Sequence, residues 1–369
     1  MSASSKRSLN LIKAVKEAEI IENLRRTNRR LVTALRKSKL SREEQLRAIT
    51  SAIYDAVSAI TIPPPIKIHQ HPDGVKEKHS SQHAIFVLSD WQLGKVTPTY
   101  NTKIAMERIR KYIERSLSIV SLHRKISPVS TARVYLVGDI VEGELIFPGQ
   151  AHALDASLFK QSAIDAPQAI SWVIATLAEN FNEVVIQCIY GNHGSLGGRA
   201  RREYHPESNA DNLAFQVSKV ITEKIPNVKW LWPASVKSWY AIDTIGNIRF
   251  LLFHGDQMRG GGFAGIPFYG FARAIHSWAS GVIPGGFDYA VCGHWHQGAS
   301  LQFNFKTLWI NGSLESYNVY AQEQLKSMSR PMQWLLFCHP KHGVTAEYKV
   351  WLSEDPYGEH DIKKIKGRD

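Results

Sequence analysis

Hydrophobic and polar positions follow two different periodicities along this chain. From residue 84 onward, short apolar runs rich in β-branched and aromatic residues alternate with segments of helical length. The runs predict strands at 84–90, 133–139, 184–192, 248–256 and 289–296, and helices near 102–123, 158–180, 208–224 and 268–280. Further β-rich stretches follow at 300–310 and 333–339. This alternation predicts a layered α/β domain over residues 84–352, in which helices cover the sheets.

Residues 1–60 follow a helical period instead. Leu24, Leu31 and Leu35 are spaced by seven and then four residues, which suits one face of a helix. Ser41 and Glu44 form a capping box that begins a second helix after a break. The pattern predicts a basic helical extension, either a hairpin or a short coiled coil. It would pack on the main domain, contact another protein, or form a homodimer, and the heptad pattern is too short to choose.

Two polar segments flank the α/β domain. Residues 61–83 contain three successive prolines followed by polar residues without an apolar period, which predicts a linker. The histidines of this segment are expected to be solvated linker residues. Residues 353–369 are expected to form a polar, basic tail.

The charge of the chain suggests an anionic partner. The 369 residues have an ordinary globular composition, with 44% hydrophobic and 21% charged residues, but a formal net charge of +12. Residues 1–60 alone hold thirteen Lys and Arg against six Asp and Glu, a difference of +7. A polyanion such as nucleic acid would account for this excess, and solubility is the simpler alternative. For the arginines of residues 1–60, a nucleic-acid contact and a solvated face are equally acceptable.

The three cysteines and the hydropathy indicate the compartment. Cys188, Cys292 and Cys338 form no CxxC pair, and two of them lie in apolar runs, as buried thiols of a reducing compartment do. No apolar run approaches the roughly 20 residues that span a bilayer, and the N-terminus has no signal-peptide pattern. The expectation is a cytoplasmic protein without a membrane partner.

Each of the five predicted strands ends in residues that can bind a metal. These residues are Asp90 and Gln92, Asp139, Asn192 and His193, His254, and the pair His294 and His296. Because strand carboxyl ends converge at one edge of an α/β sheet, they are expected to form one site. Asp, Asn and His together suit divalent ions such as Mn²⁺, Fe²⁺ or Zn²⁺. One such strand end is weak evidence, whereas five in this order make a specific signal.

The series resembles the calcineurin-like metallophosphoesterase superfamily, whose motifs run D-x-H, GD, GNH, HGD and GHxH. The resemblance covers about residues 84–315 and implies a four-layer α/β/β/α sandwich that holds two divalent ions and a bridging hydroxide. Asp139 would be the ligand shared by both ions. The resemblance further implies Asp90, Gln92 and His296 as ligands of one ion, and Asn192, His254 and His294 as ligands of the other. It implies His193 as the general acid or transition-state stabiliser that faces the leaving group.

Gln92 departs from the family pattern, which has histidine at that position. A glutamine carbonyl is a neutral, harder and weaker donor than imidazole for transition metals. The first ion would then bind loosely, or Mn²⁺ or Mg²⁺ would be favoured over Zn²⁺. We take Mn²⁺ as the preferred ion, with Mg²⁺, Fe²⁺ and Zn²⁺ as alternatives. In the alternative interpretation, Gln92 means that the first ion no longer binds and that the activity is lost with it.

Three further stretches bear on the substrate. Residues 138–150 resemble the small subunit of archaeal family-D DNA polymerase, which shares its phosphoesterase core with SbcCD-type nucleases, and residues 320–344 resemble phage or prophage proteins. Directly after the GNH motif, Arg199, Arg201 and Arg202 could clamp a phosphate or follow a nucleic-acid backbone.

The leading prediction is a metal-dependent phosphodiesterase acting on nucleic acid, as a DNA nuclease. A phosphatase or phosphodiesterase for a small, nucleotide-like substrate is the first alternative. The second is a catalytically silent binding or scaffold protein on the same fold. The direction of cleavage, the metal and the oligomeric state stay open.

Overall fold

The computed structural model describes residues 81–147, 149–233, 236–237, 239–258, 265–318, 321–325 and 328–359, together with Arg26, Glu44, Arg47 and Ser51. The chain divides into two compact units, Met1–Gln70 and His71–Asp369. Apart from the four residues named, which are helical and exposed, the predicted extension 1–60 lies outside the described residues. The same holds for linker residues 61–80 and tail residues 360–369.

The first sheet of the second unit has six strands in the order β12-β11-β1-β2-β3-β4. Strands β1 to β4 are parallel, whereas β11 is antiparallel to both β1 and β12. The strands span Gln82–Leu88 (β1), Val129–Val137 (β2), Glu183–Ile189 (β3), Val228–Trp230 (β4), Met332–His339 (β11) and Gly343–Trp351 (β12).

The second sheet also has six strands, in the order β5-β6-β7-β8-β10-β9. Its centre, β7-β8-β10, is parallel, and antiparallel strands flank it on both sides. The strands span Val236–Lys237 (β5), Tyr240–Ile245 (β6), Ile248–Phe253 (β7), Tyr289–Cys292 (β8), Ala299–Phe303 (β9) and Lys306–Ile310 (β10).

The described helices of this unit lie between the strands in sequence. They are α3 (Thr102–Arg124), α4 (Leu158–Lys160), α5 (Ala166–Asn180), α6 (Ala210–Thr222) and α7 (Phe268–Ser277). Short 3-10 turns span Gln150–Ala153 and Gly198–Glu203, and π turns span Gln161–Asp165, Trp278–Val282 and Ala321–Leu325. Asn101 and Asn209 cap α3 and α6 by accepting a backbone N–H of the first turn with their side chains.

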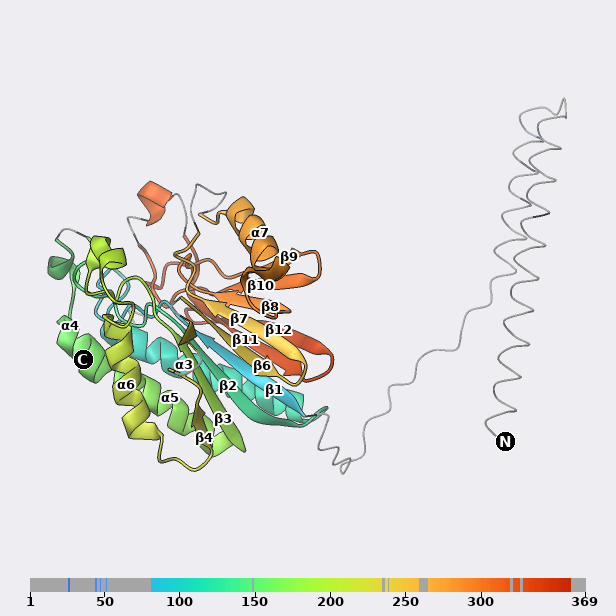
Figure 1. Cartoon of the computed structure of the whole chain (residues 1–369), viewed down its shortest axis with the longest axis horizontal. Coiled ribbons are helices and arrows are strands. Elements are labelled where there is room, and N and C mark those ends of the chain that lie inside the picture. Colours follow the sequence, from blue (N-terminus) through green and yellow to red (C-terminus); the bar gives the residue numbers. More distant parts are fainter. Residues whose placement is uncertain are drawn as a thin grey trace. The chain divides into compact units, whose positions relative to one another are not determined.

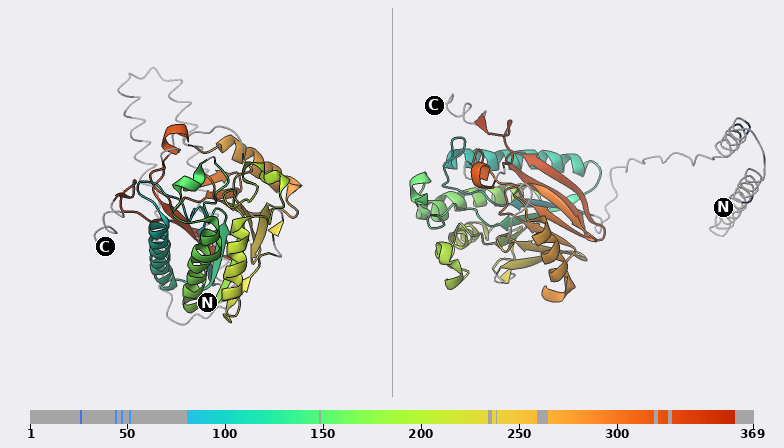
Figure 2. Two further views of the ribbon diagram at one scale, coloured as in Figure 1. Left: turned by 90° about the vertical axis from the view of Figure 1, so that its left-hand side faces the viewer. Right: turned by 90° about the horizontal axis from the view of Figure 1, so that it is seen from above.

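The side chains of a single strand reveal the layers. In β1, Ala84, Phe86 and Leu88 join the core beneath α3, α5 and α6, whereas Ile85 and Val87 join the core between the two sheets. Strand side chains alternate between faces, so a strand that is buried on both sides must be apolar throughout. Strand β7 behaves in the same way, with alternate residues facing the first sheet or α7. The predicted four-layer α/β/β/α sandwich is therefore confirmed (Figures 1 and 2).

The structure differs from the sequence pattern in two places. The predicted helix 158–180 is divided into α4, a π turn and α5, since Pro167 has no N–H to continue the α-helical hydrogen bonds. Strands β4, β5, β6 and β12 had no counterpart among the predicted strands. None of the described helices has the length and the apolar character that crossing a bilayer requires.

Candidate metal centre

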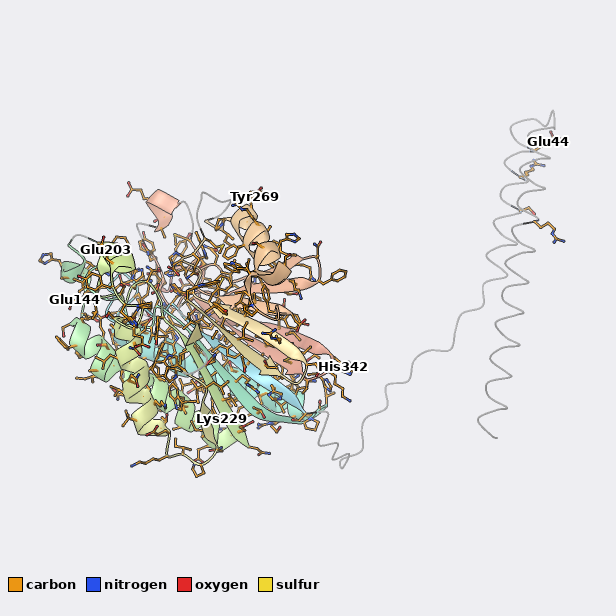
Figure 3. All side chains as sticks on the ribbon, in the orientation of Figure 1. Glu44, Glu144, Glu203, Lys229, Tyr269 and His342 are labelled. Carbon is orange, nitrogen blue, oxygen red and sulfur yellow. The ribbon has the colours of Figure 1, made fainter. Side chains whose placement is uncertain are left out.

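The residues predicted as metal ligands, together with the predicted catalytic residue His193, follow the carboxyl ends of five strands. Asp90 follows β1, Asp139 follows β2, Asn192 and His193 follow β3, His254 follows β7, and His294 and His296 follow β8. Parallel strands of both sheets therefore bring them to one end of the domain. Glu144 and Glu203 lie at this end as well, and Lys229 and His342 lie at the opposite end (Figure 3).

The backbone is unusual at these positions. Among the described residues, seven other than glycine have positive φ, and five of the seven are predicted ligands. They are Asp90 (53°), Gln92 (47°), Asp139 (52°), His294 (69°) and His296 (55°). Residues with a Cβ adopt this region at a cost, and such costs gather at functional sites.

One group of donors converges on His254. Its Nε2 atom lies 3.0 Å from Asp139 Oδ2 and 3.2 Å from Asn192 Oδ1. Its other nitrogen, Nδ1, lies 2.8 Å from the Val137 carbonyl oxygen, so a proton there orients the ring and leaves Nε2 free to bind a metal. Donor atoms of Asp139, His254 and His294 all lie within 4.8 Å of one another. This group has the composition and closeness of a divalent-cation site.

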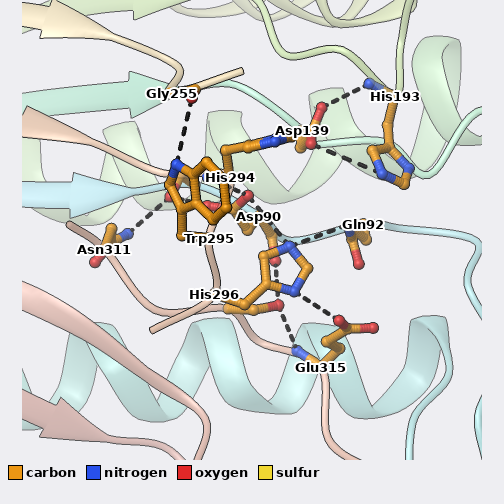
Figure 4. A network of polar contacts seen from close by, with 12 residues as sticks. Asp90, Gln92, Asp139, His193, Gly255, His294, Trp295, His296, Asn311 and Glu315 are labelled. Atoms are coloured by element: carbon orange, nitrogen blue, oxygen red, sulfur yellow. Dashed lines mark hydrogen bonds and ion pairs between the residues drawn. The ribbon is translucent and has the colours of Figure 1, made fainter. Parts of the chain in front are cut away.

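A second group surrounds His296 (Figure 4). Its Nε2 atom lies 3.4 Å from Asp90 Oδ1, and its Nδ1 atom lies 2.6 Å from Glu315 Oε1. The Gln92 amide nitrogen lies 3.2 Å from the same His296 Nε2. The Gln92 carbonyl oxygen accepts a hydrogen bond from Lys95 Nζ at 2.9 Å. The oxygen of Gln92, which a metal would require, therefore faces Lys95.

His193, the predicted general acid, is anchored at both its backbone and its ring. Its N–H donates to Asp139 Oδ1 at 2.8 Å. Its Nδ1 atom lies 3.1 Å from both the carbonyl oxygen and the carboxylate Oε2 of Glu142, while Nε2 lies 4.0 Å from Asp139 Oδ2. The ring also packs edge-on against Phe147, with centroids 6.0 Å apart. Glu142 thus holds one ring nitrogen, and the other faces Asp139.

Asp211 supports the loops that carry these residues. Its carboxylate accepts hydrogen bonds from the N–H groups of Asp139 (3.0 Å), Ile140 (3.1 Å), Val141 (3.2 Å) and Gly191 (2.9 Å). The side chain is fully buried. It joins the loop after β2 to the loop after β3, which sets Asp139 beside Asn192.

Gly191 and Gly293 have no side chain and so leave space for the carboxylates of two aspartates. A Cβ atom on Gly191 would overlap with Asp139 Oδ1, and one on Gly293 would overlap with Asp90 Oδ2. The glycines of the GNH and GHWH motifs are therefore required by the close approach of a carboxylate.

Buried acids and bases shift one another's pKa in this site. Burial by itself lowers the pKa of His254, but Asp139 outweighs it and raises that pKa to about 10. His294 has a pKa lowered to about 3, because burial and the neighbouring His254 both disfavour its charged form. Burial acts against ionised Glu315 as well, yet Lys95 and His296 hold its pKa well below the usual range. Lys95 keeps a raised pKa, since Glu142 and Glu315 outweigh the effect of burial. The site is strongly anionic, and positive charge stabilises it.

The site opens into a pocket of about 660 Å³. Polar residues of the site form its floor, including Gln92, Asn192 and His193, and apolar and aromatic residues form part of its wall, including Phe147, Trp295 and Tyr317. Such a mixture can hold a phosphate ester together with an organic group.

Several of these residues had not been assigned a role from the sequence. Lys95 and Glu142 each lie three residues after a predicted ligand, which was a usable signal. Glu315 follows the predicted strand 300–310 by five residues, a weaker signal, and nothing in the sequence connects Asp211 with Asp139. The backbone of Arg199, Arg201 and Arg202 belongs to the 3-10 turn Gly198–Glu203. The side chains of these three arginines lie outside the described part of the structure.

No protein-family model and no curated protein matches this chain. Among solved structures it is similar to a hypothetical protein from Pyrococcus horikoshii OT3, with 11% identity and a TM-score of 0.39, covering 77% of this chain and 94% of the other. It is similar to an archaeal phosphodiesterase, with 14% identity and a TM-score of 0.31, covering 72% and 99% of the two chains. It is also similar to zinc-complexed Vps29 from Entamoeba histolytica, with 13% identity and a TM-score of 0.32, covering 72% and 99%. At these TM-scores the likenesses carry no conclusion about chemistry, which rests on the chain's own residues.

Proposed function

We propose that this chain is a metal-dependent phosphodiesterase. The observation that carries the proposal is the convergence of Asp139 Oδ2 and Asn192 Oδ1 on His254 Nε2, at 3.0 and 3.2 Å, with His294 beside them. Two oxygen and two imidazole donors in a buried, anionic site fit a divalent ion of borderline softness. Mn²⁺ is our preferred ion, and Mg²⁺, Fe²⁺ and Zn²⁺ are the alternatives.

A divalent ion held by Asp139, Asn192, His254 and His294 would supply Lewis-acid chemistry, polarising the phosphoryl group and making a water molecule more acidic. The protein contributes the remaining functions. His193 stands beside Asp139, where Nε2 can give a proton to the leaving oxygen while Glu142 holds Nδ1. Phe147 packs edge-on against that ring, and both line the pocket.

We favour DNA as the substrate, so that the chain would bind DNA and cleave it as a nuclease. The net charge of +12 supports a polyanionic substrate. The arginine-bearing turn Gly198–Glu203 follows His193 closely in the chain, so its side chains could contact a phosphate backbone. The short resemblances of residues 138–150 to a polymerase subunit and of 320–344 to phage proteins stay predictions.

A small nucleotide-like ester is the second candidate. The pocket of about 660 Å³, with Phe147, Trp295 and Tyr317 in its wall, favours it, because aromatic rings can stack on a base. A strand of DNA and a single nucleotide would therefore share the same metal centre and differ in what the surrounding loops contact.

The test is hydrolysis by the full chain with and without Mn²⁺, using bis-p-nitrophenyl phosphate, p-nitrophenyl phosphate, and labelled single- and double-stranded DNA. His254→Asn removes a central donor, and His342→Asn is the matched control at the opposite end of the domain. We expect the diester to be cleaved in preference to the monoester, and cleavage to be lost only in His254→Asn. DNA cleavage that weakens with added salt would support the nuclease.

Other outcomes separate the alternatives. Cleavage of small diesters without DNA cleavage would favour the nucleotide-like substrate. Inactivity of the metal-loaded wild type on every ester would refute the proposal and leave a silent binding protein.

A further inference from the structure

Lys95 takes part in a closed ring of polar contacts inside the site. Lys95 Nζ donates to Gln92 Oε1 at 2.9 Å, and the Gln92 amide nitrogen lies 3.2 Å from His296 Nε2. His296 Nδ1 lies 2.6 Å from Glu315 Oε1, and Glu315 Oε2 lies 2.7 Å from Lys95 Nζ, which closes the ring. Each of these four side chains therefore has its polar partners within the protein.

The ammonium group sets the direction of the Gln92 amide. Ammonium groups only donate hydrogen bonds, so the group beside Lys95 must be the amide oxygen. Reversing the amide would place its N–H groups against those of Lys95, in a part of the site where Lys95 is 16% exposed and Glu315 is 4% exposed. The contact with Lys95 thus favours one orientation of the Gln92 amide.

This orientation does not fit a metal ion between Asp90 and His296. Their facing atoms, Asp90 Oδ1 and His296 Nε2, are 3.4 Å apart, and the group that Gln92 turns toward His296 Nε2 is an amide N–H₂. An amide nitrogen offers no lone pair to a cation, and its hydrogens carry positive charge. A second ion at this place would have to separate the Gln92 amide from both Lys95 Nζ and His296 Nε2.

We propose that the site binds one divalent ion, at Asp139, Asn192, His254 and His294, and that Lys95 excludes a second ion by holding Gln92 in its donor orientation. The proposal rests on the proposed function and deepens it. Lys95 is a positioning residue, and the Gln92 N–H₂ group becomes a hydrogen-bond donor for a phosphate oxygen of the substrate. The ring replaces the charge of a second ion with a fixed ammonium and a fixed amide dipole.

The test counts the ions and asks whether they are coupled. The full-length protein is loaded with Mn²⁺, freed of excess metal and analysed by elemental analysis and electron paramagnetic resonance. We expect one Mn²⁺ per chain with the spectrum of an isolated ion, in the wild type and equally in Gln92→Leu. His254→Asn should lose the ion, whereas His296→Asn should keep it. The double variant Lys95→Met, Gln92→His should bind a second ion and give the spectrum of an exchange-coupled pair.

Two results would overturn the proposal. One is a pair of coupled ions in the wild type, of which one is lost in Gln92→Leu, because Gln92 would then turn and ligate through its oxygen. The other is loss of the single ion in His296→Asn. Gln92→Leu keeps Lys95, His296 and Glu315 in place, so the conclusion stands even if the Lys95 double variant does not fold. One bound ion without any ester hydrolysis would refute the proposed function alone, and no bound ion would refute both.

Discussion

Replacing Asp211 with asparagine should uncouple the two loops that carry Asp139 and Asn192. In the wild type, Asp211 Oδ2 accepts from the N–H groups of Asp139 and Gly191, and Oδ1 accepts from those of Ile140 and Val141. Asparagine keeps one oxygen and turns an N–H₂ group toward the other two donors. Two backbone N–H groups are then left without an acceptor in a fully buried place.

The magnitude follows from those two lost contacts. A buried donor without a partner costs about 1–3 kcal/mol, so Asp211→Asn should lower the free energy of unfolding by about 2–6 kcal/mol. The assay is urea unfolding followed by circular dichroism. The control is Glu223→Gln, the same chemical change at the exposed opposite end of α6, which should shift unfolding by less than about 0.5 kcal/mol. If the free energy of unfolding of Asp211→Asn lies within about 1 kcal/mol of the wild-type value, the loops do not depend on this carboxylate.

The remaining predictions concern the site and one group far from it. His193→Gln should lower kcat by about 10²–10⁴-fold with the metal content unchanged, measured by hydrolysis and elemental analysis; loss of the metal would contradict its role as a proton donor. Gly191→Ala should abolish metal binding by displacing both the carboxylate and the backbone nitrogen of Asp139, while circular dichroism stays that of a folded protein. Unaltered metal content would refute the close approach. Chelation of the metal should lower Tm, and returning Mn²⁺ at 100 times its Kd should raise the free energy of unfolding by about 2.7 kcal/mol. A Tm that does not change with metal would contradict the metal centre. Burial and Arg133 lower the pKa of His83 to about 4 in the folded protein. Because the unfolded chain takes up a proton at a higher pH, the wild type should lose at most about 3 kcal/mol of its free energy of unfolding through His83 as the pH falls from 6.5 to 4. His83→Gln should lose measurably less over that range in urea unfolding, and an equal loss would show that other groups cause the fall.

The strand ends could be predicted because they depend on local pattern. Residues 84–88 of strand β1 are buried on both faces and are apolar without interruption, so the polar Asp90 shortly after them is conspicuous. The same contrast marks Asp139 after β2 and His254 after β7. Since parallel strands end at one edge, the nearness of these residues followed from the order of the elements.

The direction of the Gln92 amide could not be predicted in this way. Gln92 and His296 are 204 positions apart, and the ring that joins them includes Lys95 from the loop of Gln92 and Glu315 from the loop after β10. Lys95 is close to Gln92 in the sequence, but Glu315 and His296, which complete the ring, reach it only when the loops pack. Asp211 is a similar case, because it contacts Asp139 from a helix that begins 71 positions later.

By itself, the sequence determined the layered α/β fold and the set of residues at the strand ends, because hydrophobic period and strand burial are properties of short segments. Tertiary structure alone decided how those residues face one another: Asp139, Asn192 and His254 converge, Glu142 holds His193, and Glu315 joins Lys95 to His296. The physical reason is that hydrogen bonds and ion pairs act over a few ångströms between groups that the chain separates by tens to hundreds of residues. Their geometry exists only once the two sheets and their loops have come together.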